Sequence, residues 1–403
     1  SQNAKNRNET KKPNITSKIL CKISEVLKKE LISLGSDSVS FKVEGGHKLH
    51  GSIDVKVSKN ATVGLLCAAL INKGTTTFKK APKIEEVYRL IEVIVSLGVK
   101  VDWLDNGDLF IDPPKKLRLD KIDSKAARRT RSVIMYLGAL MHGYSSFRLP
   151  YAGGCKLGTR TVAPHLFALE EFGLHVDTKN LFYNVTVNKK SPGEVTLYEM
   201  GDTVSENVLM AAALTEGKTI IRNVSSNYMV QDMCFFLEAC GVKIEGIGSN
   251  TLTVTGVREI NQNITYAPSE DPIEAFSFIS AAITTGSKIT VKRCPIDFLR
   301  VELIRLQKMG CCFKISPSYK AENGYTDLVD ITTLKPEQKL IASQDKILAL
   351  THPGINMDNL PFFAPIAALA KGTTLIHDWS YEDRALYLTE LRKLGVDVKL
   401  ADP

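Results

Sequence analysis

The sequence predicts an α/β protein built from repeated β-α-β-α-β units, and three observations support this fold class. A small apolar segment ending in glycine recurs five times, a β-branched run follows it, and a second glycine closes each copy 23 to 30 residues later. A regular period of this kind indicates one supersecondary unit used repeatedly. The glycine pairs that mark the copies are Gly74 and Gly98, Gly143 and Gly173, Gly217 and Gly241, Gly286 and Gly310, and Gly372 and Gly395.

The first copy, residues 48–103, shows how each element follows from the sequence. Alternation in 48–58 predicts a strand, and helical periodicity in 59–74 predicts a helix that a left-handed cap at Gly74 ends. The β-branched run 75–82 predicts a second strand. Residues 83–98 have apolar positions near i, i+3, i+4 and i+7, which is typical of an amphipathic helix. A closing strand follows from residue 99.

The later copies repeat this order and indicate where their helices lie. The first helix of each copy contains a small apolar run, whereas the second helix carries more charge. A helix that is apolar on all sides is buried, so we expect the first helices inside and the second helices facing solvent. Buried helices enclosed by sheets make an inside-out α/β arrangement, the reverse of the usual sandwich. The five apolar runs are CAAL, LGAL, MAAAL, FISAA and IAALA.

Length and composition narrow the class of protein. A chain of 403 residues with 44% apolar and 24% charged residues is typical of a soluble protein with two domains. The sequence has no apolar run long enough to span a membrane and no apolar core of a signal peptide, so we expect a cytoplasmic protein. Residues 1–40 predict an extension that is disordered and then forms one helix over 16–34.

Charge and cysteine content leave some partners open and argue against others. The net charge of +8 is spread along the chain, which fits a site for an anionic metabolite as well as nucleic-acid binding. The eight cysteines form no CxxC pair and no zinc-like spacing with histidine. We therefore expect reduced thiols and no metal site.

Polar residues at the starts of the apolar helices are the first candidates for chemistry. Lys59 and Arg131, near positive helix ends, predict an anion site, although a solvated lysine beside an Asn60 cap is the plainer interpretation. Asp271 precedes an apolar helix and is either an N-cap or an acid–base group. Neighbouring acids, Glu270 and Glu274, favour a raised pKa at Asp271.

The loop GGCKLGTR, residues 153–160, is the most distinctive segment of the sequence. It stands in the second copy where the other copies have a short turn. Lys156 and Arg160 flank Cys155 and favour a reactive thiolate, whereas a lone cysteine is otherwise a small buried apolar residue. His165 follows closely and, taken alone, is a surface or core histidine.

The repeats, helix starts and loop together resemble the enolpyruvyl transferases, most closely the UDP-N-acetylglucosamine 1-carboxyvinyltransferase branch. The motifs SKNA (58–61), GGCKLGTR and EDPIEAF (270–276) carry the resemblance, which runs from about Phe41 to Leu400. It implies two inside-out α/β domains of three units each, closing over a cleft. The first would span 59–225. The second would combine 41–58 with 226–403, in which two units are recognisable and a sixth is not found.

The resemblance also implies an activity and the residues that perform it. The activity is transfer of the enolpyruvyl group of phosphoenolpyruvate to UDP-N-acetylglucosamine, the first committed step of peptidoglycan synthesis, with no cofactor. It assigns catalysis to Cys155, which reacts with phosphoenolpyruvate or fosfomycin, to Asp271, which transfers a proton at the sugar 3-hydroxyl, and to Lys59. Substrate contacts fall on Lys59, Asn60, Arg131, Arg160, Val162, His165, Asp271 and Arg384.

The chain departs from that branch in places where the acceptor is bound. The turn before the third apolar helix usually reads Lys-Val-Ser-Val-Gly, and here residues 199–203 read EMGDT. Ala163 replaces an aspartate, and residues 227–230 lack an acidic-proline motif. A 3-phosphoshikimate-type transferase and a non-catalytic UDP-sugar-binding paralogue therefore stay open as alternatives. We expect no nucleic-acid or membrane partner, and the sequence leaves the oligomeric state open.

Overall fold

The computed structural model describes residues 42–152, 161–380 and 384–401. The loop with Cys155 and Arg160, and the helix predicted over 16–34, lie outside the described residues. The chain divides into two compact units, residues 1–47 and 48–403. Described residues 42–47 form no helix or strand, so the fold below is that of the second unit.

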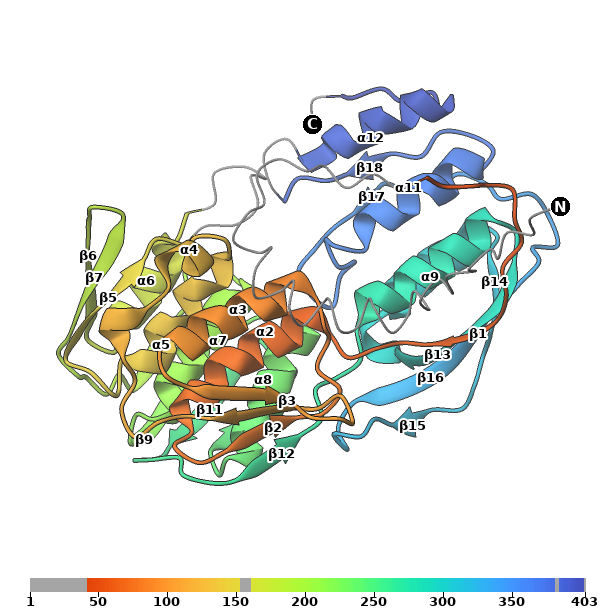
Figure 1. Ribbon diagram of the computed structural model, residues 1–403. Coiled ribbons are helices and arrows are strands. Elements are labelled where there is room, and N and C mark those ends of the chain that lie inside the picture. Colours follow the sequence, from red (N-terminus) through yellow and green to blue (C-terminus); the bar gives the residue numbers. More distant parts are fainter. Residues whose placement is uncertain (1–41, 153–160, 381–383, 402–403) are drawn as a thin grey trace, which may run out of the picture. The chain divides into compact units, whose positions relative to one another are not determined.

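Helices and small sheets alternate from residue 50 to Tyr266 (Figure 1). The three sheets have the strand orders β12-β2-β4-β3, β5-β7-β6 and β10-β11-β9-β8. The helices are α2 (Lys59–Ala68), α3 (Glu85–Ser96), α4 (Ser124–Ala127), α5 (Tyr136–Leu140), α6 (Ala163–Glu170), α7 (Asp202–Ala213) and α8 (Tyr228–Ala239). The strands are β2 (Thr76–Phe78), β3 (Lys100–Trp103), β4 (Leu109–Asp112), β5 (Ser146–Pro150), β6 (Leu174–Lys179), β7 (Phe182–Val187), β8 (Glu194–Thr196), β9 (Gly217–Arg222), β10 (Lys243–Glu245), β11 (Thr251–Gly256) and β12 (Ile264–Tyr266).

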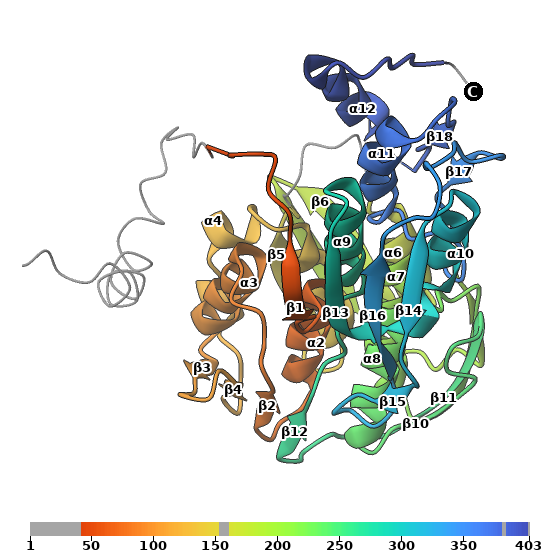
Figure 2. The same cartoon turned by 90° about the vertical axis from the view of Figure 1, so that its right-hand side faces the viewer.

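A larger sheet organises the rest of the unit, and Figure 2 shows its strands side by side in the order β1-β13-β16-β14. β1 runs parallel to β13, whereas β16 pairs antiparallel with β13, β14 and β15. The strands of this sheet are β1 (His50–Asp54), β13 (Lys288–Pro295), β14 (Cys312–Ile315), β15 (Tyr319–Lys320) and β16 (Asp327–Leu334). β17 (Ile347–Leu348) and β18 (Ile376–His377) form a separate parallel pair. The helices are α9 (Pro272–Thr284), α10 (Arg300–Lys308), α11 (Leu360–Leu369) and α12 (Tyr387–Glu390).

The buried helices confirm the predicted α/β fold class and its inside-out character. Every residue of α2 from Ala61 to Ala68 is buried, and so is every residue of α7 from Val204 to Ala213. The prediction that second helices face solvent is wrong for α8, which buries most of its length. α8 packs against both α2 and α7, and its apolar side chains occur on more than one face.

Gly74 corrects one detail of the predicted unit. Eight of the marker glycines have positive φ, but Gly74 and Gly143 do not, so no left-handed cap stands at Gly74. A Cβ on Gly74 would lie 2.3 Å from the carbonyl oxygen of Gln262. Glycine is required there because two backbone segments approach closely, not because of the local helix end.

The buried apolar residues form two cores. The first core contains buried side chains from Ala61 to Tyr266, and the second contains Val55 and residues from Ala275 to Ile366. The domain boundary predicted after residue 225 stays a prediction. Because α8 and β10–β12 contribute to the first core, we propose that the boundary lies near Ala267.

Candidate active site

The start of α2 holds a lysine at a partly exposed helix N-terminus. Ser58 caps the helix, its Oγ accepting a hydrogen bond from the Ala61 amide at 3.2 Å. The Lys59 ammonium pairs with Glu86 Oε2 at 2.5 Å, and Ser132 Oγ donates to Glu86 Oε1 at 3.1 Å. With 40% of its side chain exposed, Lys59 is accessible to an anion that would also meet the positive end of α2.

Asp271 joins the start of α9 to the start of α2. Its Oδ1 accepts hydrogen bonds from the amides of Ile273 at 2.8 Å and Glu274 at 3.2 Å, which is the N-cap geometry. Its Oδ2 accepts a hydrogen bond from the Lys59 amide at 3.2 Å. Burial raises the pKa of Asp271, and these amide donors oppose the rise. The N-cap role is therefore met, and the acid–base role stays a prediction.

Asn60 contacts a tyrosine that the sequence did not single out as a site residue. Asn60 Nδ2 donates to the Tyr228 hydroxyl at 3.1 Å, and Tyr228 is 1% exposed. Burial raises the pKa of Tyr228 well above its usual range, and the negative charge of Asp271 adds to the rise. The buried hydroxyl therefore stays protonated at neutral pH. It stands between the polar starts of α2, α8 and α9.

Asp358 is a second carboxylate near this tyrosine. Arg384 donates from Nη2 to Asp358 Oδ1 at 3.2 Å and to the Met357 carbonyl at 2.6 Å, and its Nε donates to Asp378 at 3.2 Å. The Asp358 side chain is 45% exposed, and its charge contributes to the raised pKa of Tyr228. The sequence signal was present, because polar residues open the fifth apolar helix, but it did not distinguish Asp358 from a cap.

Arg131 and His165 lie near each other but differ in their surroundings. Arg131 Nη2 donates to the Thr161 carbonyl at 3.0 Å, just before Val162 at the N-cap position of α6. His165 is 6% exposed, and Asn207 Nδ2 lies 3.1 Å from its Nδ1. Burial, with a smaller contribution from the Arg131 charge, lowers the pKa of His165 to about 4. His165 thus packs between α6 and α7 as a neutral ring.

The predicted residues are only partly brought together by the contacts. Lys59, Asn60 and Asp271 meet at the paired helix starts. Arg131 is connected to them through Ser132, its neighbour, and Glu86. Arg384 donates a hydrogen bond to Asp358, and none of its hydrogen bonds described above goes to Lys59. The contacts of His165 lie within the first core.

The altered turn before α7 places its acid inward. Ser225 Oγ donates to Asp202 Oδ1 at 2.5 Å, and Asn227 Nδ2 donates to Asp202 Oδ2 at 3.1 Å. Burial raises the pKa of Asp202, and the negative charge of Asp358 adds slightly to the rise. An internal carboxyl therefore occupies the N-terminal end of α7, where an anion would otherwise be favoured.

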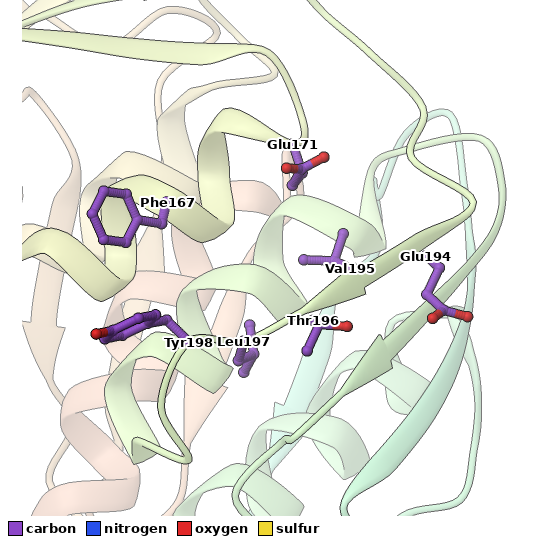
Figure 3. A pocket seen from close by; sticks show the side chains of 7 residues that line it. All are labelled: Phe167, Glu171, Glu194, Val195, Thr196, Leu197 and Tyr198. Atoms are coloured by element: carbon purple, nitrogen blue, oxygen red, sulfur yellow. The ribbon is translucent and has the colours of Figure 1, made fainter.

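A hollow of the described surface lies elsewhere (Figure 3). It measures about 700 Å³, and the rings of Phe167 and Tyr198 meet edge to face at 5.8 Å beside it. None of the predicted site residues lines it, so the candidate site rests on the hydrogen-bonded helix starts and not on this hollow. Its lining residues are Phe167, Glu171, Glu194, Val195, Thr196, Leu197 and Tyr198.

Two further features bear on the predicted class of protein. No helix within residues 42–152, 161–380 and 384–401 combines the length and the apolar character needed to cross a bilayer. In the same part of the chain, no group of three or more His, Cys, Asp or Glu side chains is arranged to hold a metal ion. The cysteines there are free, and Cys67, Cys234, Cys240, Cys294 and Cys311 are buried.

Comparison with known proteins agrees with the fold. The profile of the family described as EPSP synthase (3-phosphoshikimate 1-carboxyvinyltransferase) matches residues 43–402. A UDP-N-acetylglucosamine 1-carboxyvinyltransferase of Bradyrhizobium diazoefficiens is 30% identical over 368 residues, covering 91% of this chain and 83% of the relative. UDP-N-acetylglucosamine 1-carboxyvinyltransferase 2 of Caldanaerobacter subterraneus is 27% identical, covering 89% and 82%.

Solved structures of similar fold extend the comparison. The enolpyruvyl transferase NikO from Streptomyces tendae matches with a TM-score of 0.75 at 20% identity, covering 89% of this chain and 81% of that one. An EPSP synthase from Acinetobacter baumannii matches with a TM-score of 0.65 at 19% identity, covering 88% and 80%. The resemblance inferred from the sequence motifs and the predicted fold are both confirmed.

Proposed function

Because the chain belongs to the EPSP synthase family of enolpyruvyl transferases, we propose that it transfers the enolpyruvyl group of phosphoenolpyruvate to the 3-hydroxyl of UDP-N-acetylglucosamine and releases phosphate. The names of the curated relatives support this choice of acceptor. In a cell the reaction would be cytoplasmic and would be the first committed step of peptidoglycan synthesis. No cofactor is needed in this proposal.

One observation carries the proposal from the structural side. The Lys59 amide donates to Asp271 Oδ2 at 3.2 Å, so the residue expected to contact phosphoenolpyruvate adjoins the carboxylate expected to move a proton. The Ser58 amide also donates to the Ser269 carbonyl at 2.8 Å, and the Asp271 amide donates to the Lys56 carbonyl at 2.9 Å. These backbone bonds fix the two segments together and give the reacting groups a defined geometry.

The chemistry needs the groups found at this junction. The acceptor oxygen forms a bond to C2 of phosphoenolpyruvate while its proton leaves and another proton is added to C3. The resulting tetrahedral ketal then loses phosphate from C2 and a proton from C3, which restores the double bond. Acid–base groups must serve both proton transfers, and cations must stabilise the phosphate and carboxylate of the intermediate.

The roles proposed for individual residues follow from this scheme. Lys59 would stabilise the phosphoenolpyruvate anion, Asn60 would contact the sugar, and Asp271 would accept the acceptor's proton. Arg131, Val162, His165 and Arg384 keep their proposed substrate contacts. Cys155 and Arg160, outside the described residues, are proposed on the resemblance alone as the reactive thiol and a phosphate ligand.

Phosphate release tests the reaction directly. Purified protein with both substrates should release phosphate at a rate that saturates in each substrate, and omission of either substrate should abolish the release. Lys59→Met, which keeps the length of the side chain and removes its charge, should strongly reduce the rate. Absence of release by the unaltered chain would refute the proposed reaction.

The half-buried acid of the altered turn favours one alternative acceptor class. Asp202 occupies the start of α7 with bonds from Ser225 and Asn227, which makes this helix end a poor site for a diphosphate. A 3-phosphoshikimate-type acceptor is therefore the second candidate. Thermal unfolding separates the two, because UDP-N-acetylglucosamine should raise Tm under the main proposal and 3-phosphoshikimate under the alternative. Binding of UDP-N-acetylglucosamine without turnover would indicate a non-catalytic paralogue.

A further inference from the structure

Tyr228 occupies the segment where residues 227–230 depart from the family motif, and its hydroxyl is buried among the site groups. Tyr228 is the first residue of α8, with Asn227 as its N-cap. Asn60 Nδ2 donates a hydrogen bond to the phenolic oxygen. A buried polar group is costly unless it is hydrogen-bonded, so this bond helps to fix the position of the hydroxyl.

An aromatic neighbour packs against the tyrosine ring. The Phe298 ring meets the Tyr228 ring edge to face at 5.7 Å, and Phe298 in turn lies 4.9 Å from the His352 ring. Ser226, two residues before Tyr228, donates to the His352 carbonyl at 3.2 Å. The ring therefore packs between α8 and Phe298, which also packs against the first core.

The Asn60 side-chain amide turns its Nδ2, not its Oδ1, toward Tyr228. Asn60 Nδ2 donates to Tyr228 at 3.1 Å, and Asn60 Oδ1 has no hydrogen bond among the described residues. Asn60 is half-buried, so Oδ1 is open to a ligand. A carbonyl oxygen accepts hydrogen bonds only, and its natural partner in the proposed acceptor is a sugar hydroxyl or an acetamido N–H.

We infer that Tyr228 is a positioning residue that orients the Asn60 amide so that Oδ1 accepts a hydrogen bond from the acceptor sugar. The inference rests on the proposed function and assigns a role to a residue that the family motif does not supply. Tyr228 is assigned no proton transfer of its own. It acts through Asn60 and leaves the phosphoenolpyruvate contacts of Lys59 untouched.

Tyr228→Phe tests this role because it removes the hydroxyl and keeps the ring. Loss of one buried hydrogen bond corresponds to about a tenfold change. We expect the KM for UDP-N-acetylglucosamine to rise about tenfold while the KM for phosphoenolpyruvate stays unchanged. Tyr136→Phe is the matched control, because Tyr136 is equally buried and its hydroxyl has no hydrogen-bond partner in the described structure.

A double-mutant cycle with Asn60→Ala separates positioning from simple loss of stability. If Tyr228 acts through Asn60, the Tyr228→Phe/Asn60→Ala protein should have the same KM for the acceptor as Asn60→Ala alone. Independent, multiplying effects would overturn the inference, and so would a Tyr228→Phe protein with unchanged acceptor KM. An equal rise in both KM values with a lowered Tm would indicate a structural role and would also overturn it.

Failure of the proposed function gives a different result. If the unaltered chain binds UDP-N-acetylglucosamine but releases no phosphate, the proposed reaction is refuted. The affinity for this acceptor, measured by calorimetry, then still tests the role of Tyr228. The expected result is then about tenfold weaker binding of the acceptor by Tyr228→Phe and unchanged binding by Tyr136→Phe. If the unaltered chain does not bind this acceptor at all, both the reaction and the inference fail.

Discussion

We predict that the protein loses stability in mild acid because His165 becomes protonated, and that substitution of His165 removes this loss. The ring is buried between α6 and α7, and its Nδ1 faces the Asn207 side-chain amide at 3.1 Å. Asn207 Nδ2 also donates to the Ile134 carbonyl at 3.1 Å, while the Gly138 amide donates to Asn207 Oδ1 at 2.7 Å. The Asn207 amide is therefore fixed with Nδ2 toward His165, and Nδ1 must accept.

Protonation of His165 would place a second donor against this amide. The pKa of His165 is lowered from 6.5 to about 4 in the folded state. A histidine with a lowered folded pKa contributes stability that is present above pH 6.5 and is lost as the pH falls toward 4. At roughly 1.4 kcal/mol per pH unit, the full loss amounts to about 3 kcal/mol.

Urea unfolding between pH 7.5 and pH 4.5 measures this loss. His165→Asn removes the titrating ring, so the difference in unfolding free energy between the unaltered and substituted chains should shrink by roughly 2–3 kcal/mol over that range. His175→Asn serves as the control because His175 is exposed on β6. A His165→Asn protein whose stability falls with pH in parallel with the unaltered chain would show that His165 does not carry this linkage.

Three further predictions address backbone, catalysis and the loop thiol. Gly74→Ala should destabilise the fold by about 1–3 kcal/mol in urea unfolding, because its Cβ would meet Gln262 backbone, whereas Gly143→Ala should be tolerated with 3.7 Å to its nearest neighbour. Asp271→Asn should lower kcat about 100-fold if it moves the acceptor's proton, and a larger loss in Asp358→Asn would transfer that role to Asp358. Fosfomycin should add one adduct by intact mass that Cys155→Ser abolishes; an unmodified native protein would contradict a reactive Cys155.

The sequence predicted the elements whose formation depends on local pattern. The apolar run of α2 and the equally apolar run of α7 indicated burial on all sides, and both helices are buried. The amphipathic spacing of 83–98 predicted α3, which spans Glu85–Ser96. Periodicity reports how one element divides its faces between core and solvent, so such predictions need no knowledge of the partner.

Predictions failed where a distant segment decides the outcome. Gly74 looked like a helix cap, but the backbone of Gln262 requires the glycine. Tyr228 looked like a departure from a motif, and its hydrogen bond to Asn60 spans 168 positions in the sequence. Asp358 was not singled out as a site residue, and its carboxylate accepts a hydrogen bond from Arg384, 26 positions away. Each depends on long-range contacts that a local pattern does not report.

The pairing of Lys59 with Glu86 bears on how the proposed site would admit its anionic substrate. Both side chains are partly exposed, and an ion pair of this kind is worth no more than about 1 kcal/mol. An incoming phosphate carries more negative charge than Glu86 and also meets the N-terminal end of α2. Exchange of Glu86 for phosphate at Lys59 is therefore inexpensive. Once phosphate displaces it from Lys59, Glu86 still accepts its hydrogen bond from Ser132, the neighbour of Arg131. Substrate binding at Lys59 would therefore affect contacts at the start of the second apolar helix.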